Sequence, residues 1–304
     1  MIRRIRIYAL GLAASVAAMA TIALAGDLNP PAGPVAPTHK TLTEIEPRIV
    51  INATNTPGTA TALFSITQPG SYYLTGNVTG MVGKNGIEIT VAPIGPSVTI
   101  DLMGYELTGV AGSLDGILVT AAATQNIAVR NGTVRAWGGD GVDAFNAGNS
   151  LLEDLRVRGN GGNGLRAGAA NTVRGCKALS NIGDGISASF GSTVTGCTAS
   201  FSTGDGIEVN GDCRVTDNTC DDNGSVGDGA GIHATGDDNR IEGNSVTDND
   251  RGMDIDVAGN LIIRNSASGN TTNYDIVAGN FTGTIVATEA AMNAAANANV
   301  NIAF

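Results

Sequence analysis

Apolar residues recur along most of the chain in two phrases that alternate and keep a regular spacing. In the first phrase, Asp-Gly-Ile and its variants, successive apolar residues lie 21 to 30 positions apart. These residues are Ile87, Ile117, Val142, Leu165, Ile186, Ile207, Ile232, Met253 and Ile276. The second phrase, between copies of the first, contributes Val129, Leu152, Val173, Val194, Val215, Ile241 and Ile262. Two columns that keep register over so much of the chain indicate an internal repeat.

The period of the repeat decides between architectures. A helix–turn–helix repeat needs more than about 30 residues, whereas a spacing of 21 residues suits two or three short strands with tight turns. In a coil of this kind each strand pairs with its counterpart about 4.8 Å away, so like residues stack on like. A leucine-rich repeat of similar length would need several leucines at fixed positions, and they are absent. The pattern predicts a parallel β-helix with apolar columns inside.

A column of asparagine also keeps the repeat. Its members are Asn160, Asn181, Ser202, Asn223, Asn249 and Asn270. Because asparagine tolerates left-handed backbone geometry, we expect the chain to turn sharply at this column. Stacked asparagine side chains can also hydrogen-bond to one another along the column.

The phrases NTVRGCKALSNIGDGI and STVTGCTASFSTGDGI resemble the right-handed β-helix repeat of the pectin-lyase-like superfamily. The segments ITQPGSYYLTGNVTG and VTIDLMGYELTG resemble the first coils of such domains. The resemblance covers about residues 61 to 288 and implies an all-β right-handed parallel β-helix of about nine coils. It implies a fold rather than an activity, because this fold carries many activities. In this superfamily, substrate grooves commonly follow the outward face of one strand column.

The two ends of the chain depart from the repeat. Residues 1–25 have a basic start, an alanine-rich apolar run and a small-x-small cleavage site, which predict a secretory signal peptide, with an uncleaved anchor helix as the alternative. Residues 26–60 are proline-rich and predict an extended linker. Residues 61–287 are assigned to the β-helix. Residues 288–304 are assigned to a C-terminal cap, in which a short N-capped helix covers the open apolar end.

Export and charge narrow the choice of partners. Cleavage removes three of the 17 basic residues, which leaves 14 against 28 acidic residues and a net charge of −14. Such a chain repels nucleic acid and anionic lipid, so we expect no nucleic-acid partner. No other stretch is long enough to cross a membrane. We expect a monomer that is secreted, periplasmic or on the cell surface, with a polysaccharide or a surface molecule as its partner.

Alternation along the Asp-Gly-Ile strand defines an outer face. The residue after each inward isoleucine points outward, as does the residue two further on. The first outward column is Glu88, Leu118, Asp143, Arg166, Ser187, Glu208, His233, Asp254 and Val277. The second is Thr90, Thr120, Phe145, Gly168, Ser189, Asn210, Thr235, Asp256 and Gly279. The inner columns are uniform and these two are varied and polar, so a site is expected here.

The densest polar group on this face comprises Glu208, His233, Asp254 and Asp256, with Arg251 beside them. Spacing by coils places the Glu208 and Asp254 carboxylates about 10 Å apart, and those of Asp254 and Asp256 about 7 Å apart. The shorter separation is within the range of an inverting carboxylate pair. The first four are therefore the candidate catalytic residues, and Arg251 is a candidate substrate-binding residue. The alternative is a solvated strand face without chemistry.

Two aromatic residues are further candidates. Trp137 stands in the asparagine column and is expected to project from a corner, whereas Phe145 lies on the outward face. Exposed rings suit stacking on the apolar face of a sugar. With Arg166 they are candidate substrate-binding residues, and the alternative is that both rings pack against the N-terminal linker or a loop of the first coils. Extra residues around positions 223–227 lengthen the coil before His233, and such insertions often map to a binding face.

Cysteine spacing and one loop motif bear on metals. Cys176, Cys197, Cys213 and Cys220 lack the spacing of a metal site and are expected to be small buried side chains, with a Cys213–Cys220 bond as the alternative. Residues 138–145 fit one calcium-binding nonapeptide of β-roll toxins, but the next coil does not repeat it. We therefore expect no metal and no cofactor, with Ca²⁺ as the alternative.

Three functions stay open on the sequence alone. The polygalacturonase branch of the superfamily uses paired aspartates, Gly-His-Gly and Arg-Ile-Lys. Here Asp221-Asp222 falls at a turn, His233 stands in Gly-Ile-His-Ala, and Arg240-Ile241 is followed by Glu242. We therefore favour non-catalytic binding of glycans or surface partners. The alternatives are a polysaccharide hydrolase or lyase that uses the outward face, and a structural spacer, so whether the chain is an enzyme is undecided.

Overall fold

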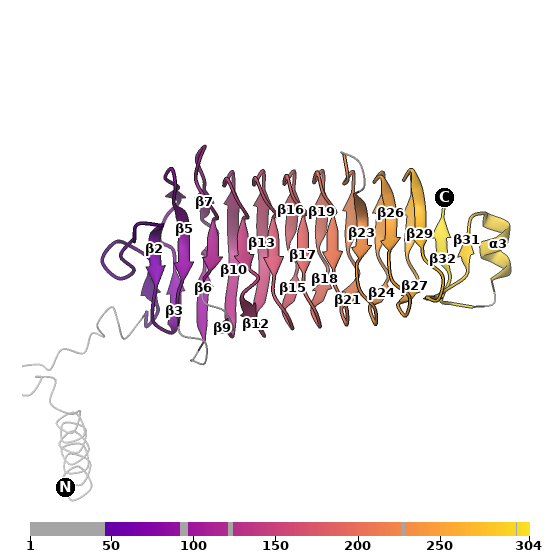
Figure 1. Ribbon diagram of the computed structural model, residues 1–304, viewed down its shortest axis with the longest axis horizontal. Coiled ribbons are helices and arrows are strands. Elements are labelled where there is room, and N and C mark those ends of the chain that lie inside the picture. The colour runs from indigo at the N-terminus through magenta and orange to yellow at the C-terminus, as the bar shows by residue number, and fades with distance from the viewer. Residues whose placement is uncertain (1–45, 92–96, 121–123, 226–228, 296) are drawn as a thin grey trace, which may run out of the picture. The chain divides into compact units, whose positions relative to one another are not determined.

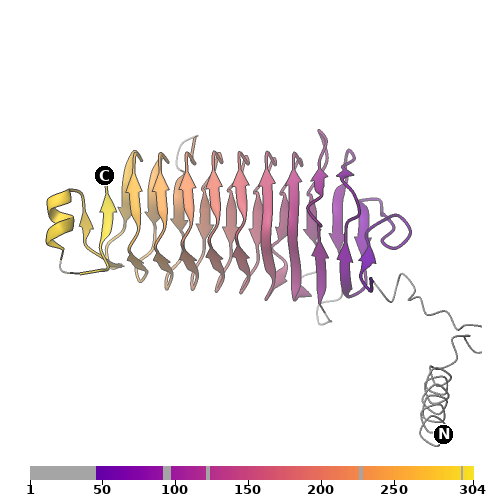
Figure 2. The ribbon, with the colours of Figure 1, turned by 180° about the vertical axis from the view of Figure 1, so that it is seen from behind.

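The computed structural model describes residues 46–91, 97–120, 124–225, 229–295 and 297–304. Within Arg48–Phe304 these residues form one compact unit, a parallel β-solenoid of about ten turns (Figure 1). Seen from the opposite side, the strands of successive turns again stack in parallel (Figure 2). The expected fold class is confirmed. The solenoid has about one turn more than the nine expected, because a strand precedes the first Asp-Gly-Ile strand.

One strand of each turn belongs to a ten-stranded sheet that carries the Asp-Gly-Ile phrases. Its strands are β2 (Ala62–Ile66), β5 (Asn85–Ile89), β8 (Ile117–Val119), β11 (Val142–Ala144), β14 (Leu165–Ala167), β17 (Ile186–Ala188), β20 (Ile207–Val209), β23 (Ala230–Ala234), β26 (Arg251–Ile255) and β29 (Thr272–Ile276). Every pairing is parallel and joins neighbouring turns, as a solenoid requires.

The other strands form a twenty-stranded sheet, to which a typical turn contributes two short strands separated by a bend. Its strands are β1 (Ile49–Val50), β3 (Gly70–Tyr73), β4 (Val78–Thr79), β6 (Val98–Asp101), β7 (Glu106–Thr108), β10 (Ile127–Arg135), β13 (Leu151–Arg158), β15 (Thr172–Arg174), β16 (Lys177–Leu179), β18 (Thr193–Thr195), β19 (Thr198–Ser200), β21 (Arg214–Thr216), β22 (Thr219–Asp221), β24 (Arg240–Glu242), β25 (Ser245–Thr247), β27 (Leu261–Ile263), β28 (Ser266–Ser268), β30 (Phe281–Thr282), β31 (Ile285–Val286) and β32 (Asn301–Ala303). A small pair, β9 (Thr124–Gln125) and β12 (Ala147–Gly148), stands apart.

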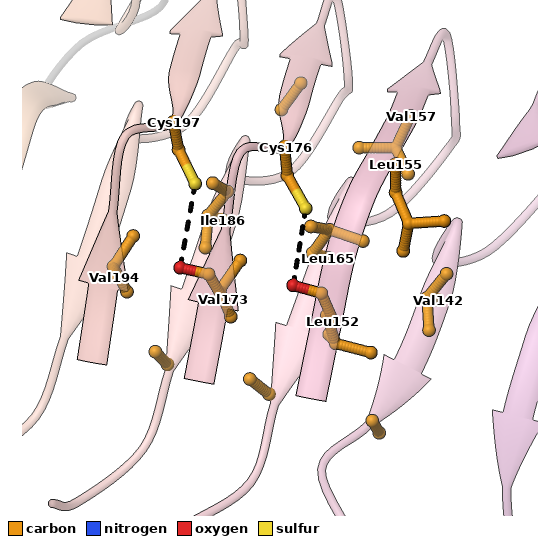
Figure 3. Close-up of a cluster of buried hydrophobic side chains, with 14 of the residues drawn as sticks. Val142, Leu152, Leu155, Val157, Leu165, Val173, Cys176, Ile186, Val194 and Cys197 are labelled. Carbon is orange, nitrogen blue, oxygen red and sulfur yellow. Dashed lines mark hydrogen bonds between the residues drawn. The ribbon is translucent and has the colours of Figure 1, made fainter. Parts of the chain in front are cut away.

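The apolar columns expected from the repeat fill the interior. Val173, Val194 and Val215 are partners in successive turns and are fully buried. Figure 3 shows this packing, with the valines of the twenty-stranded sheet facing Leu165 and Ile186 of the other sheet. The last turn departs from the expected register: Tyr274, not Ile276, pairs with Met253. Asp275 therefore stands beside Asp254 in the outward column, in place of the expected Val277.

The four cysteines are buried, as expected, and their thiols are free. Cys176 and Cys197 stack in neighbouring turns, and their Sγ atoms donate to the carbonyl oxygens of Leu152 and Val173 at 3.5 and 3.8 Å (Figure 3). Burial raises the pKa of the Cys220 thiol, so it stays protonated among apolar neighbours. These thiols therefore act as small core side chains.

The asparagine column is a buried ladder of hydrogen bonds rather than the left-handed bend itself. Asn223 Nδ2 donates to Asn249 Oδ1 at 3.0 Å and to the Ala199 carbonyl oxygen at 2.9 Å. The left-handed positions are the residues just before the ladder, such as Ser180 and Asp222. The ladder amide must point inward to reach the next turn, so the preceding residue makes the bend. Our assignment of the bend was wrong by one residue.

A second asparagine ladder stands at another corner. Asn218, Asn244, Asn265 and Asn301 are each buried, and the Nδ2 of each of the first three donates to the Oδ1 of the next member at 3.0 to 3.3 Å. Such ladders satisfy backbone carbonyls that the bends leave unpaired, since Asn244 Nδ2 also donates to the Val215 carbonyl oxygen.

The first ladder explains the glycine of Asp-Gly-Ile. A Cβ built on Gly164 would lie 2.7 Å from Asn181 Nδ2, and one on Gly206 would lie 2.8 Å from Asn223 Nδ2. The neighbouring turn's carbonyl oxygen is closer still, at 2.5 Å from the Gly164 position. Glycine is required here because the side-chain amide of the ladder asparagine and the backbone of the neighbouring turn occupy the space that a Cβ would need.

The segments predicted to precede the β-helix lie only partly within the described residues. The signal peptide, the proline-rich run and His39 lie outside them. Strand β1 falls inside the segment assigned to the linker, yet it pairs with β3, and Ile51 beside it is buried. None of the helices in the described part of the chain is long and apolar enough to span a membrane.

The C-terminal helix forms where expected. Helix α3 (Glu289–Ala294) is capped by Thr288, whose Oγ1 accepts the Ala291 N–H at 3.1 Å. None of its residues is buried. That it covers the apolar end stays a prediction. Strand β32 extends the twenty-stranded sheet beside β28.

Ser202 interrupts the first ladder, and its replacement should stabilise the protein. Asn181 Nδ2 and Ser202 Oγ are the buried side-chain atoms without a hydrogen-bond partner in the described residues. Ser202→Asn supplies the missing amide, and Gly185 leaves room for it as Gly164 does for Asn181. We expect the free energy of unfolding to rise by about 1 kcal/mol in denaturant titrations.

Ser192→Asn is the matched control, because the Ser192 hydroxyl already donates to the Gly168 carbonyl oxygen and accepts the Asn171 N–H. It should give no gain in stability. Equal or lower stability of Ser202→Asn would contradict the ladder geometry.

Candidate functional site

The site begins with a column of polar residues that precede the glycines of the ten-stranded sheet. The column comprises Asn85, Asp115, Asp140, Asn163, Asp184 and Asp205. Each Oδ1 accepts a backbone N–H from the next turn, at 2.6 to 2.9 Å. In most turns this aspartate therefore serves the fold, because it satisfies a backbone donor at the corner.

Burial raises the pKa values of three aspartates of this column. Burial, assisted by neighbouring carboxylates, raises the pKa of Asp140 to about 6 and that of Asp184 to about 7. Burial likewise raises the pKa of Asp115. Close carboxylates in partly buried positions resist joint ionisation.

The column ends at Asp205, and this end is where it meets His233. In the next turn Ala230 takes the column position and donates its N–H to Asp205 Oδ1 at 2.6 Å. Asp205 Oδ2 is then directed at His233 Nδ1, 2.9 Å away. The Asp205 side chain is 9% exposed, so this contact is largely shielded from water.

His233 bridges carboxylates of the turn before its own and the turn after it. Strand pairing places it between Glu208 on β20 and Asp254 on β26. Its Nε2 lies 3.1 Å from Asp256 Oδ2 and 3.9 Å from Asp254 Oδ2. Burial by itself would lower the pKa of His233, but Asp205 and Asp256 outweigh it and raise the pKa to about 9. At neutral pH His233 is therefore an imidazolium that donates from both nitrogens.

Arg251 is the second cation of the group. It donates from Nη1 to Asp254 Oδ2, and its Nε lies 3.4 Å from Asp275 Oδ2. Burial raises the pKa of Asp254, and the bond from Arg251 opposes this rise. On the other side, Ser187 Oγ donates to Glu208 Oε1 at 3.4 Å. We call Asp205, Glu208, His233, Arg251, Asp254, Asp256 and Asp275 the His233 group.

The structure thus brings together the five candidates Glu208, His233, Arg251, Asp254 and Asp256. Sequence reasoning missed Asp205, although its column was visible as the aspartate of Asp-Gly-Ile. It also missed Asp275, because the last turn was placed two residues out of register. The insertion before His233 lies partly outside the described residues.

The remaining candidates lie three to four turns away, and one of them is corrected. Trp137 is buried at 2% exposure, and its Nε1 donates to the Leu107 carbonyl oxygen, so its ring is not available to a ligand. The expectation that it projects was wrong because the ring packs over the glycines of two earlier turns. Phe145 is 47% exposed, and the Arg166 guanidinium lies 4.3 Å from its ring centroid.

The group could also hold a metal ion in two ways. The ligand atoms of Asp205, Glu208 and His233 lie within 4.8 Å of one another, as do those of His233, Asp254 and Asp256. Because both nitrogens of His233 face carboxylates and carry protons, a metal would have to displace a proton first.

The protonation state of His233 can be measured directly. We expect NMR titration of its ring to give a pKa of about 9, and Asp256→Asn to lower it, because one of the two carboxylates is lost. The chain has two histidines, so His233→Gln assigns the signal. Because the folded-state pKa is raised, the stabilisation is complete below about pH 6.5 and is lost as the pH rises through about 9. A value near 6.5 would contradict the geometry.

The raised pKa values in the aspartate column predict that replacing a buried aspartate by asparagine stabilises the protein at high pH. The folded-state pKa of Asp184 is above its unfolded value, so ionisation destabilises the fold as the pH rises from about 4 through about 7. Asp184→Asn keeps the acceptor, as Asn163 does one turn earlier. We expect it to raise the unfolding free energy by roughly 1 to 2 kcal/mol near pH 8 and to have no effect near pH 4.

The exposed Asp237 lies outside the column, so Asp237→Asn is the control and should show no such pH dependence. Chemical denaturation at both pH values makes the comparison. A loss of stability in Asp184→Asn near pH 8 would mean that the ionised carboxylate is needed.

Comparison with known proteins supports the fold at the level of sequence and structure. The family described as "right handed beta helix region" matches residues 75–200 and 167–300. No curated protein matches the chain. Among solved structures, Dettilon tailspike protein has a TM-score of 0.51 at 16% identity, covering 80% of this chain and 50% of its own.

Two enzymes with the same general fold are also similar. The A-module of a mannuronan C-5 epimerase from Azotobacter vinelandii has a TM-score of 0.49 at 15% identity, over 81% of this chain and 74% of its own. A pectate lyase has a TM-score of 0.48 at 18% identity, over 78% and 70%. At these identities the likeness concerns the fold alone. Since the family match spans most of the solenoid, the chain belongs to the right-handed β-helix family.

Proposed function

We propose that the outward face of the ten-stranded sheet binds an uncharged glycan whose chain follows the solenoid axis. The observation that carries the proposal is a row of six aligned positions, one per turn, that leads from an exposed ring to the His233 group; at five of them a side chain reaches the surface. The row is Phe145, Gly168, Ser189, Asn210, Thr235 and Asp256. Backbone bonds between successive turns keep its members in line.

Phe145 supplies an apolar platform at one end of the row. Its ring is exposed and lies under the Arg166 guanidinium, which Asp143 holds at 3.6 Å. A fixed aromatic ring next to hydrogen-bonding groups suits a sugar, which has an apolar face and polar edges. Gly168 in the next turn is buried, and a Cβ there would lie 2.3 Å from the Phe145 carbonyl oxygen, so this position adds no side chain to the row.

Hydrogen-bonding groups occupy the middle and the other end. Asn210 Nδ2 donates to Thr235 Oγ1 at 3.1 Å, which orients both side chains along the row. Asp256 is 53% exposed and can accept from a hydroxyl group. Acidic residues of the His233 group outnumber His233 and Arg251, so a carboxylated sugar would be repelled there. This favours an uncharged ligand.

A polysaccharide hydrolase or lyase is the second candidate. His233 Nε2–H between Asp254 and Asp256 is the observation that favours it, because a held proton next to two carboxylates can serve acid–base chemistry. A pKa of about 9 makes this proton hard to release near neutral pH. Binding without turnover is therefore the preferred function. Export, predicted from residues 1–25, would bring the face into contact with extracellular polysaccharides.

The test is a glycan array followed by calorimetry with the uncharged oligosaccharides that bind. We expect Phe145→Ala and Asp256→Asn each to weaken binding by about fivefold or more, as for an interface contact worth about 1 kcal/mol. Phe201→Ala is the matched control, because Phe201 is also exposed, at 51%, but lies at another corner.

Turnover is measured on the same ligands. New reducing ends or unsaturated products, abolished in His233→Gln, would establish the enzyme and reject binding alone. If no glycan binds and none is turned over, the face is a spacer surface and the proposal fails.

A further inference from the structure

Four cationic residues cluster on the twenty-stranded sheet, although the chain as a whole carries a negative net charge. Arg135 and Arg158 are strand partners in β10 and β13, and Arg156 and Lys177 are partners in β13 and β16. We call these four residues the basic block. They come from three successive turns, so their attachment points are about 4.8 Å apart along the axis.

The fold does not require these charges. Like charges directly opposite each other on neighbouring strands destabilise a sheet. In the following turns the column of Arg156 and Lys177 continues as Thr198 and Thr219, with the same pairing. Threonine therefore satisfies the structure at this column, and the cations need another explanation.

Three of the four charges are not neutralised. Arg135 Nε donates to Glu106 Oε2 at 3.1 Å, whereas Arg156, Arg158 and Lys177 have no ion pair within the described part of the chain. All three are exposed. The adjacent column behaves differently, because there Glu153 stands between Arg130 and Arg174 and accepts from Arg174 Nε at 2.8 Å.

Two hollows lie beside the cations. A cavity of about 360 Å³ is lined by Arg156 and Lys177, together with Asn131 and the exposed Asp154. A smaller one, of about 150 Å³, is lined by Arg135 and Arg158. With Glu106 and Asp154 counted, the region keeps an excess of two positive charges on a protein that is strongly acidic elsewhere.

We propose that the basic block binds an acidic polysaccharide, one with a carboxylate or sulfate group on successive sugar units. Arginine forks match planar carboxylates and similar oxyanions in a bidentate manner. The block has no aromatic side chain on which a base could stack, and three free cations are fewer than the six to ten phosphate contacts of a typical DNA-binding surface. This site is distinct from the glycan face of the ten-stranded sheet and does not depend on it.

The test uses the full chain and two probes, polygalacturonate oligomers and dextran sulfate, in calorimetry at low salt. The triple variant Arg156→Gln, Arg158→Gln, Lys177→Thr should lose at least about tenfold in affinity, and wild-type binding should fall severalfold as salt rises from about 50 to about 200 mM. Arg174→Gln is the matched control, since its charge is already paired with Glu153; it should change affinity less than about twofold.

The expected thermal midpoint of the triple variant is equal to or above that of wild type, because like-charge pairs are removed. If the triple variant does not fold, the single Lys177→Thr substitution replaces it and should still lose severalfold in affinity. Unchanged binding in these variants overturns the proposal, as does tighter binding of single-stranded DNA or anionic vesicles than of both probes. Phe145→Ala should bind the probes normally, so failure of the glycan face and failure of this site are distinguishable.

Discussion

The structure depends on one constraint: the buried hydrogen-bonding groups of each turn find their partners in the turns before and after it. Short strands bend three times per turn, and every bend removes backbone groups from the regular ladder. Buried asparagines, such as Asn223 and Asn244, replace those partners by donating both to a neighbouring carbonyl and to the next asparagine. Where the ladder loses a member, at Ser202, two buried polar atoms have no partner among the residues that the structure describes.

This constraint distinguishes the residues that the fold requires from the outward residues that it allows to vary. The glycine of Asp-Gly-Ile is needed because the ladder amide fills the place of a Cβ, and the aspartate or asparagine before it is needed as an acceptor for the next turn's N–H. Outward side chains have no such task. Asp205 belongs to both classes, since one carboxylate oxygen serves the backbone and the other holds His233. One carboxylate can thus both satisfy the backbone and hold an outward side chain.

The stacking of turns also allows the local charge of one surface to differ from the net charge of the chain. Neighbouring turns are closer than the screening length of physiological salt, about 8 Å, so a few substitutions in one column create a field of either sign. The His233 group concentrates carboxylates around two cations on one sheet. The basic block places arginine opposite arginine on the other. The net charge of −11 describes neither face, and it excludes a class of partner only for the molecule as a whole.

The sequence by itself determined the β-helix, the apolar columns and the outward face with Glu208, His233, Asp254 and Asp256, because period and alternation are properties of local order. Tertiary structure alone decided the rest. Trp137 is buried because earlier turns leave room over their glycines, and Tyr274 replaces Ile276 because the last turn pairs two residues earlier than the phrase suggests. The link from Asp205 to His233 and the basic block both join different turns. Both features depend on which residues become neighbours across turns and on how their side chains pack. The spacing of residues along the chain specifies neither the neighbours nor the packing.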